Sequence, residues 1–359
     1  TLPVLYYRAI TRILIRNRNA IGWCTGSLVN NTRRDFTPYL LTAQHCGLNN
    51  FSGNLIPQSD FDQWIFYFEY EAENCNGPAS DFGLEQRSVI GAAPLAHSDD
   101  EGGDTGSDFL LLLLSEAVPA DWEPVFAGWS VENVASPFGV TIHHPEGDLK
   151  KIATYTRAPA SGEFGEDVPD THWLVNWAST ANGHGVTEAG SSGAPLFDNG
   201  GRITGLLTGG SASCGRPNAT DFFGKMYWSW DKNGSLPQNR LKDWLDPDFT
   251  GVTLLNASSY SQNVITALPD EAFPRPARVQ VWPNPATSCL NVAMGQAKQV
   301  NQQRFRLLSL AGSEVAILKP LGQGAEAVEL PLPVLKPGLY LLEVQTTSTI
   351  TRIKIQIAP

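Results

Sequence analysis

The chain of 359 residues has no long apolar run and few stretches with helical periodicity. Its longest apolar run, Phe109 to Leu114, is far too short to span a bilayer, which takes about 20 such residues. Apolar residues seldom recur with the 3.6-residue spacing of a helix, and 33 glycines and 25 prolines interrupt the chain. Many short strands are therefore expected. No signal peptide opens the chain, and it begins with Thr1 rather than methionine, so we expect a processed or truncated piece.

Length and charge narrow the class of protein further. A chain of this size exceeds one ordinary core, so two or three domains are expected. With 42% hydrophobic and 17% charged residues it is globular. The net charge of −11 is uneven, with +4 from Arg278 onward and −15 before it. An acidic body disfavours nucleic acid as a partner and fits solubility or cationic substrates.

The pattern divides the chain into three parts. Residues 1–257 form one unit of short apolar segments bounded by Gly, Asn, Asp or Pro, such as "DFTPYLLTAQHC". The unit ends in "LPQNRLKDWLDP", which predicts a helix with Leu236, Leu241, Trp244 and Leu245 on one side. Residues 258–277 have the composition of a linker. Residues 278–359 predict a small antiparallel β-sandwich, with alternating apolar positions such as Ile350, Ile353, Ile355 and Ile357.

The segment "EAGSSGAPLF", residues 188–197, predicts a serine nucleophile on a tight turn. Acyl transfer needs a hydroxyl at the surface and two backbone N–H groups aimed at the developing oxyanion. Glycine relieves crowding in such a loop because it lacks Cβ and reaches positive φ. Ser192 is then the candidate nucleophile, and the N–H groups of Gly190 and Ser192 are the candidate oxyanion hole. An ordinary surface turn is the alternative.

His45 is the candidate general base among six histidines. It follows the strand-like "YLLTA" and precedes Cys46, while Cys24 lies on the preceding strand-like segment. A Cys24–Cys46 disulfide would clamp the loop that carries the imidazole and stabilise the fold by about 3 kcal/mol. An ordinary capping or surface histidine is the alternative.

Asp108 is the candidate acid that orients His45. It begins a wholly apolar strand, where the chain turns inward from a polar loop, as a carboxylate must to accept the imidazole N–H. The rival acids Asp99, Asp100, Glu101 and Asp104 are interpreted as a solvated loop.

The other histidines give no functional signal. His143 and His144 are adjacent, so they point to opposite faces of a strand, and they are interpreted as structural rather than as a metal pair. His184 has no partner acid. No metal or organic cofactor is expected.

The order of "CTGSLVNN", "LLTAQHC", "SDFLLLL" and "GSSGAP" resembles the chymotrypsin-like serine endopeptidases. "TGSLVNNT", "IHHP", "VTEAGSSG", "SWDKNG" and "DWLDP" more closely resemble the bacterial lysyl endopeptidase branch, over about residues 8–257. The resemblance implies a trypsin-like pair of six-stranded antiparallel barrels with the active site between them. His45 and Asp108 would come from the first barrel and Ser192 from the second.

The same resemblance implies cleavage after lysine. The pocket aspartate of trypsin-type enzymes has no counterpart here, because Val186 stands at that position. In the lysyl branch the acid lies in a segment like "NATDFFGK". This makes Asp221 the candidate floor of the specificity pocket, and a surface turn residue is the alternative. A single carboxylate suits the ammonium of lysine, whereas the arginine fork prefers two acceptors. Gly209 and Gly210 would line the extended substrate strand.

Three positions depart from these patterns. Thr208, beside the substrate strand, stands where the lysyl branch can have histidine, and Phe164 stands near a position that can hold tryptophan. Both positions neighbour the catalytic histidine in the family, so a different rate or pH optimum is expected. Ser191 replaces the aspartate that receives a new N-terminus in trypsin-like zymogens, so activation by that ion pair is not expected.

The remaining cysteines leave alternatives open. Cys75 and Cys214 resemble positions that pair with cysteines of an N-terminal segment in the family. Either the chain is truncated, or these two are free or bonded to each other. Cys289 belongs to the last domain and is expected to be unpaired.

"VWPNPATSCLNV", "SLAGSEV" and "LKPGLYLLEV" resemble the C-terminal sorting domain of the type IX secretion system, over about residues 278–359. This implies passage through the periplasm and export to the cell surface or medium, with the secretion machinery as a partner. A generic fibronectin-like or carbohydrate-binding sandwich is the alternative.

The combined prediction is a secreted serine endopeptidase acting on protein or peptide substrates with lysine. A catalytically inactive, protease-like surface binding protein and an esterase of the same mechanism are the alternatives.

Overall fold

The computed structural model describes residues 6–49, 52–72, 87–165, 168–261, 279–283, 286–294, 304–309, 314–321, 328–345 and 350–358. The chain separates into two compact units, Thr1–Thr266 and Ala267–Pro359. Strands dominate both units, which confirms the expected all-β class. Within the described ranges, no helix has the length and apolar character needed to cross a membrane.

Seven strands of the first unit form an antiparallel sheet that closes on itself. Their order across the sheet is β5-β4-β1-β2-β3-β7-β6. The strands are β1 (Ile10–Asn17), β2 (Ala20–Leu28), β3 (Tyr39–Ala43), β4 (Ile65–Phe68), β5 (Arg87–Ile90), β6 (Ala92–His97) and β7 (Phe109–Leu114). Only Gly91 separates β5 from β6 in the chain, although they lie at opposite ends of the sheet. The two ends must therefore meet, and β5 and β6 act as one bent strand of a six-stranded barrel.

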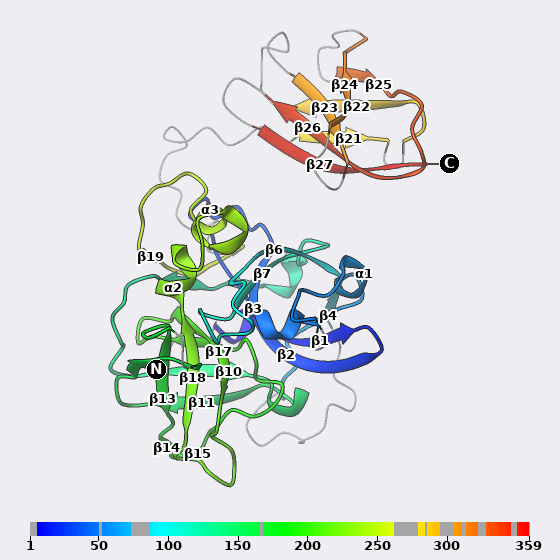
Figure 1. The fold of residues 1–359 in the computed structure, drawn as a ribbon. Helices are drawn as coiled ribbons and strands as arrows, with labels where there is room; N and C mark the ends of the chain where they lie inside the picture. Colours follow the sequence, from blue (N-terminus) through cyan, green and yellow to red (C-terminus); the bar gives the residue numbers. More distant parts are fainter. Residues whose placement is uncertain are drawn as a thin grey trace. The chain divides into compact units, whose positions relative to one another are not determined.

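A second sheet in the same unit closes in the same way. Its main path is β11-β10-β16-β17-β18-β13-β12, to which β9 and β19 are attached. Residues 156–159 alone join the two end strands, β11 and β12, so this path is also a six-stranded barrel with one bent strand. The strands are β9 (Gly128–Ser130), β10 (Gly139–His143), β11 (Lys151–Tyr155), β12 (Ala160–Gly162), β13 (His172–Asn176), β16 (Pro195–Phe197), β17 (Arg202–Gly210), β18 (Thr220–Lys225) and β19 (Leu254–Leu255). In Figure 1 the blue and cyan strands of the first barrel lie beside the green strands of the second.

The remaining elements of the first unit are short. Two small strand pairs join β14 (Ser179–Thr180) to β15 (Gly183–His184), and β8 (Val125–Phe126) to β20 (Ser258–Ser259). The α-helices are α1 (Gln58–Phe61), α2 (Met226–Asp231) and α3 (Lys242–Leu245). The 3-10 turns are η1 (Tyr6–Ala9), η2 (Gln44–Gly47), η3 (Ala120–Trp122), η4 (Pro145–Gly147) and η5 (Pro237–Asn239).

The apolar strand β7 is buried on both faces, which explains its unbroken hydrophobic sequence. Phe109 and Leu111 pack in a cluster that also contains Phe197 of the second barrel. Leu110 and Leu112 point the other way, into the core of the first barrel, because side chains alternate along a strand. Asp108 directly precedes β7 and therefore lies at the boundary between the barrels.

The prediction of a single helix across Leu236 to Leu245 is wrong. The segment forms η5 and α3, with Arg240 in extended conformation between them. The Leu241 N–H donates to the carbonyl of Ser229 in α2 rather than to its own segment. This contact between elements buries Leu241 and Leu245 fully and leaves Leu236 53% exposed.

The first residues of the expected linker belong to the first unit. Ser258 and Ser259 pair with β8, and the ring of Tyr260 lies 4.5 Å from that of Phe36. Residues 262–277 of the expected linker lie outside the described residues.

The C-terminal unit contains two antiparallel sheets around one core. The three-stranded sheet is β21 (Val279–Trp282), β22 (Cys289–Met294) and β25 (Val328–Pro331), in that order. The four-stranded sheet is β24 (Glu314–Leu318), β23 (Arg304–Leu308), β26 (Gly338–Gln345) and β27 (Ile350–Ile357). Leu290 and Val328 of one sheet and Leu307, Leu342 and Ile355 of the other share a single buried cluster. This is the expected small sandwich.

Candidate active site

His45 and Asp108 are held together by two hydrogen bonds. His45 Nδ1 lies 2.6 Å from Asp108 Oδ2, and the His45 N–H donates to Asp108 Oδ1 at 2.9 Å. The Asp108 side chain is fully buried, whereas that of His45 is 32% exposed. Burial opposes protonation of the imidazole, but the charge and hydrogen bond of Asp108 outweigh it and raise the pKa of His45.

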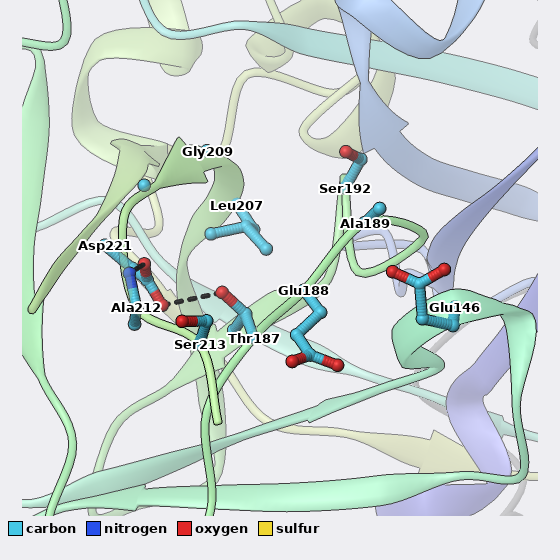
Figure 2. Close-up of a pocket in the computed structure, with 11 residues that line it drawn as sticks. Glu146, Thr187, Glu188, Ala189, Ser192, Leu207, Gly209, Ala212, Ser213 and Asp221 are labelled. Atoms are coloured by element: carbon cyan, nitrogen blue, oxygen red, sulfur yellow. Dashed lines mark hydrogen bonds between the residues drawn. The ribbon is translucent and has the colours of Figure 1, made fainter. Parts of the chain in front are cut away.

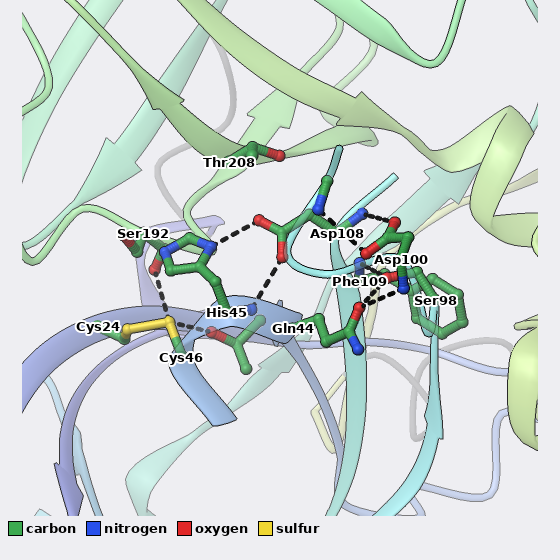
Figure 3. Close-up of polar contacts among 12 residues, drawn as sticks. Cys24, Gln44, His45, Cys46, Ser98, Asp100, Asp108, Phe109, Ser192 and Thr208 are labelled. Carbon is green, nitrogen blue, oxygen red and sulfur yellow. Dashed lines mark hydrogen bonds and ion pairs between the residues drawn. A yellow bond between two sulfur atoms is a disulfide. The ribbon is translucent and has the colours of Figure 1, made fainter. Parts of the chain in front are cut away.

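The expected disulfide is confirmed. Cys24 on β2 and Cys46 in η2 are bonded. Because Cys46 directly follows His45, the bond ties the turn that carries the imidazole to the first barrel (Figure 3).

Ser191 and Ser192 have opposite environments. Ser191 is fully buried, and its hydroxyl accepts the Glu188 N–H and lies 2.7 Å from His143 Nδ1. Ser192 is partly exposed, and its carbonyl accepts the Thr25 N–H at 2.8 Å. Ser192 is thus the serine of this pair that is open to solvent.

Two glycines allow the Ser192 turn to dock on its surroundings. Gly193 has a φ of +80°, and a Cβ there would lie 2.2 Å from Thr42 Oγ1 of the first barrel. Gly190 has a φ of +86°, and a Cβ there would lie 2.9 Å from the Gly147 nitrogen. Both the conformation and the close approach require glycine.

Ser192 reaches the neighbourhood of His45 through this docking. Its carbonyl oxygen is 3.9 Å from Cys46 Sγ, next to His45 in the chain. Figure 3 shows Ser192 and Asp108 on opposite sides of the imidazole. In the described part of the chain, no hydrogen bond joins the Ser192 hydroxyl to His45. The N–H groups of Gly190 and Ser192 also donate to no group among the described residues.

A pocket of about 390 Å³ opens beside Ser192. Figure 2 shows Asp221 at the opposite end of the lining from Ser192. Of the three candidate substrate-binding residues of β17, Gly209 and Gly210 line it and Thr208 does not. Two further carboxylates, those of Glu146 and Glu188, also line it and were not identified from the sequence.

Asp221 is a buried carboxylate rather than a surface turn residue. It is 1% exposed. Its Oδ2 accepts Trp177 Nε1–H at 2.7 Å and the Thr187 hydroxyl at 2.6 Å, and its Oδ1 accepts the Ala212 N–H at 3.1 Å. These donors are neutral, as is the Thr187 N–H, which also binds Asp221. Burial raises the pKa of Asp221 against the effect of these hydrogen bonds.

Thr208 is buried and faces away from the pocket. Its hydroxyl lies 2.9 Å from His172 Nε2, and His172 Nδ1 lies 2.7 Å from the Thr171 hydroxyl. Burial lowers the pKa of His172 to about 4. The ring centroid of Phe164 lies 5.8 Å from that of His172. Thr208 and Phe164, two of the three departures from the family pattern, therefore both lie beside this neutral histidine.

Residues 5–224 match the family described as lysyl endopeptidase, C-terminal domain. The match covers more than half of the chain and includes all the candidate residues above. The chain belongs to this family. It is a serine protease of trypsin-like fold that acts on protein or peptide substrates.

Three solved structures resemble the chain at low sequence identity. A thermostable serine protease, AL20, from an extremophilic microorganism is 14% identical, with a TM-score of 0.42 over 61% of this chain and 91% of its own. The protease Anisep from Arthrobacter nicotinovorans is 15% identical, with a TM-score of 0.42 over 61% and 90%. A Glu endopeptidase in complex with MPD is 15% identical, with a TM-score of 0.37 over 62% and 86%.

Residues 280–358 match the family described as a secretion system C-terminal sorting domain. This is the expected type IX sorting domain, and it agrees with the β-sandwich of the second unit. The protease is therefore exported through the periplasm to the cell surface or the medium.

His143 and His144 are buried, and two cysteines of the described residues are free. His143 contacts Ser191, and His144 Nδ1 lies 2.9 Å from the Asp148 carbonyl oxygen. Cys214 and Cys289 are free, and Cys75 lies outside the described residues. Within the described ranges, no cluster of three or more His, Cys, Asp or Glu side chains could hold a metal ion.

The interpretation of residues 99–104 as a solvated loop is wrong for Asp100. Its side chain is buried and accepts the Asp108 N–H at 2.8 Å. Asp99, Glu101 and Asp104 are exposed, as expected. A run of acids gives no signal that one of them turns inward.

Proposed function

We propose that the protease cleaves peptide bonds by a relay of Ser192, His45 and Asp108. The observation that supports it most strongly is the double hydrogen bond between His45 and the fully buried Asp108. A carboxylate bound to Nδ1 fixes the tautomer of the imidazole and leaves Nε2 free to accept a proton. The hydrogen bond from the nucleophile to such a base often tightens only when substrate is bound.

In the proposed reaction, the Ser192 oxygen attacks the scissile carbonyl carbon while its proton passes to His45 Nε2. The Asp108 charge stabilises the imidazolium that forms. The carbonyl oxygen becomes an oxyanion and accepts the unpaired N–H groups of Gly190 and Ser192. The imidazolium then protonates the leaving amine, the C–N bond breaks, and water hydrolyses the acyl-enzyme by the same route.

Cleavage after lysine is the substrate preference that the pocket supports best. A lysine side chain entering beside Ser192 would bring its ammonium to the Asp221 carboxylate, whose hydrogen-bond donors are neutral and which forms no salt bridge with the described residues. Hydrogen bonds from Trp177, from the hydroxyl and N–H of Thr187 and from the Ala212 N–H use most of the about four acceptor positions of a carboxylate, so Asp221 offers mainly its charge. That suits the compact ammonium of lysine better than the two-pronged guanidinium of arginine. A glutamate side chain would meet Asp221 with like charge.

Digestion of a denatured protein mixture tests this proposal. The new C-termini, read by mass spectrometry, are expected to be lysine, with no cleavage by a Ser192→Ala control. Arginine at an equal share of the new ends would show that the pocket assignment is too narrow, and apolar ends would show that it is wrong. No cleavage by the wild-type protein would favour the binding role. Hydrolysis of simple lysyl esters without lysyl amides would favour the esterase.

A further inference from the structure

Asp100 is a buried carboxylate beside His45 and Asp108 that the reaction above does not use. It lies in the loop of residues 98–108, between β6 and β7, and is 2% exposed. Its Oδ2 accepts the Asp108 N–H at 2.8 Å, and its Oδ1 accepts the Gly103 N–H at 3.1 Å. Burying a carboxylate is unfavourable, so a role for its charge has to be sought in these contacts.

The contact with Asp108 holds an unusual backbone conformation. Asp108 has a φ of +51°, in the left-handed region that residues other than glycine adopt infrequently. Its N–H is bound by Asp100, and its carbonyl accepts the Gln44 N–H at 2.9 Å. Because the backbone angles fix the direction of the Cα–Cβ bond, these contacts set where the Asp108 carboxylate meets His45.

The contact with Gly103 holds the loop against the same pair. Gly102 and Gly103 have φ values of +86° and +106°. A Cβ at Gly102 would lie 3.1 Å from His45 Cβ, and one at Gly103 would lie 3.2 Å from Asp108 Cβ. The loop therefore packs directly on both side chains, and Asp100 binds one of the two glycines that allow this packing.

A second set of hydrogen bonds joins the loop to the turn that carries His45. Gln44 Oε1 accepts the Ser98 hydroxyl at 2.7 Å and the Asp100 N–H at 3.2 Å. The Ser98 oxygen accepts the Phe109 N–H at 3.1 Å. Figure 3 shows this network on the side of Asp108 that faces away from the imidazole.

We propose that Asp100 is a positioning residue, whose negative charge fixes the Asp108 main chain and the covering loop, so that His45 and Asp108 are fully productive only while Asp100 is ionised. This role rests on the proposed function of the pair.

The groups around Asp100 make its charge sensitive to pH. Burial, followed by the nearby Asp108 charge, raises the pKa of Asp100 to about 6. His45 is the group there that gains positive charge, and the Asp100 charge contributes to its raised pKa. His97 lies 3.4 Å from Gln44 Nε2, and burial lowers its pKa despite the nearby Asp99. His172 lies beside the same loop, since a Cβ at Gly103 would be 3.6 Å from His172 Nε2, and it is neutral above about pH 4 because burial lowers its pKa.

The test compares Asp100→Asn with Asp99→Asn in the full chain. Asp99 is adjacent and exposed, so its substitution removes the same charge without touching the network. We expect Asp100→Asn to lower kcat on the order of 10- to 100-fold, with little change in KM, because small misplacements of catalytic groups have effects of this size. Asp99→Asn should match the wild type, and Asp100→Glu should recover part of the loss.

The pH profile separates positioning from a general loss of stability. Both His45 and Asp100 must be deprotonated, so the acid limb of log kcat/KM against pH should approach a slope of about 2 in the wild type. It should return to about 1 in Asp100→Asn. A wild-type kcat and an unchanged slope in a folded Asp100→Asn would overturn the proposal. If that variant does not fold, the wild-type slope decides, with about 1 overturning the proposal and about 2 supporting it.

Histidine NMR keeps this test distinct from that of the proposed function. The pKa of His45 is expected to fall in Asp100→Asn and to stay unchanged in Asp99→Asn. This measurement does not require catalysis. If the wild-type protein is inactive but its His45 pKa still responds to Asp100, the proposed function is wrong and the interaction of Asp100 with His45 is supported. An active protein whose His45 pKa and kcat do not respond would reject the positioning role alone.

Discussion

Replacing Asp221 with asparagine should abolish the preference for lysine while preserving the protease fold. Asparagine has nearly the same shape, and its amide oxygen can keep part of the hydrogen bonding from Trp177, Thr187 and the Ala212 N–H. The negative charge at the pocket floor is lost. A lysine ammonium at the pocket floor would then lose the carboxylate there, and the neutral donors to Asp221 do not replace its negative charge.

The expected loss in kcat/KM for a lysyl peptide follows from the burial of Asp221, which is 1% exposed. Two unit charges about 4 Å apart attract by about 4 kcal/mol at an effective dielectric constant of about 20. Because about 1.4 kcal/mol corresponds to a tenfold change in rate, kcat/KM for a lysyl peptide should fall about 10³-fold.

The assay uses two peptide amides that differ only at the residue before the scissile bond, lysine in one and norleucine in the other. For Asp221→Asn, we expect the large loss for lysine and an unchanged or increased kcat/KM for norleucine. An equal loss for both peptides would mean that the substitution damaged the catalytic groups instead. An unchanged ratio of lysine to norleucine would refute the assignment of Asp221 as the specificity residue.

Three further predictions concern the pocket wall, the disulfide and pH. Gly210→Ala should reduce activity on lysyl peptides strongly, because its Cβ would lie 2.0 Å from Asp221 Oδ1; wild-type kinetics would contradict this. Replacing Cys24 and Cys46 with alanine should lower the free energy of unfolding by about 3 kcal/mol, since the bond closes a separation of 22 residues; denaturant unfolding measures it, and no change would contradict the estimate. His172, whose pKa is lowered to about 4, stays neutral in the fold while the unfolded chain takes up a proton below about pH 6.5. Stability should therefore be lost as pH falls from about 6.5 to 4, by about 3 kcal/mol from this residue, and His172→Gln should show a smaller loss in urea unfolding.

Local sequence was sufficient for the features that depend on neighbours in the chain. Cys46 beside His45 indicated the clamped turn, and six apolar residues after Asp108 indicated a wholly apolar strand. Glycines around Ser191 and Ser192 indicated a tight turn. The resemblance to the lysyl endopeptidases added the two barrels and the candidate pocket residue Asp221.

Features made by distant segments could not be predicted in this way. Nothing near Asp221 in the sequence indicates that Trp177 and Thr187 bind its carboxylate. Asp100 lies among other acids, and the N–H groups of Gly103 and Asp108 that its buried side chain binds come together only when the whole loop folds. Thr208 was expected beside the substrate but binds the buried His172, which comes from another strand.

Labelling with an active-site fluorophosphonate, followed by peptide mapping, tests the Ser192 relay most directly. A covalent adduct on Ser192 is expected in the full-length wild-type protein, with none in Ser192→Ala and far slower labelling in His45→Ala. Labelling of another residue, or equal labelling rates in the wild type and His45→Ala, would contradict the relay.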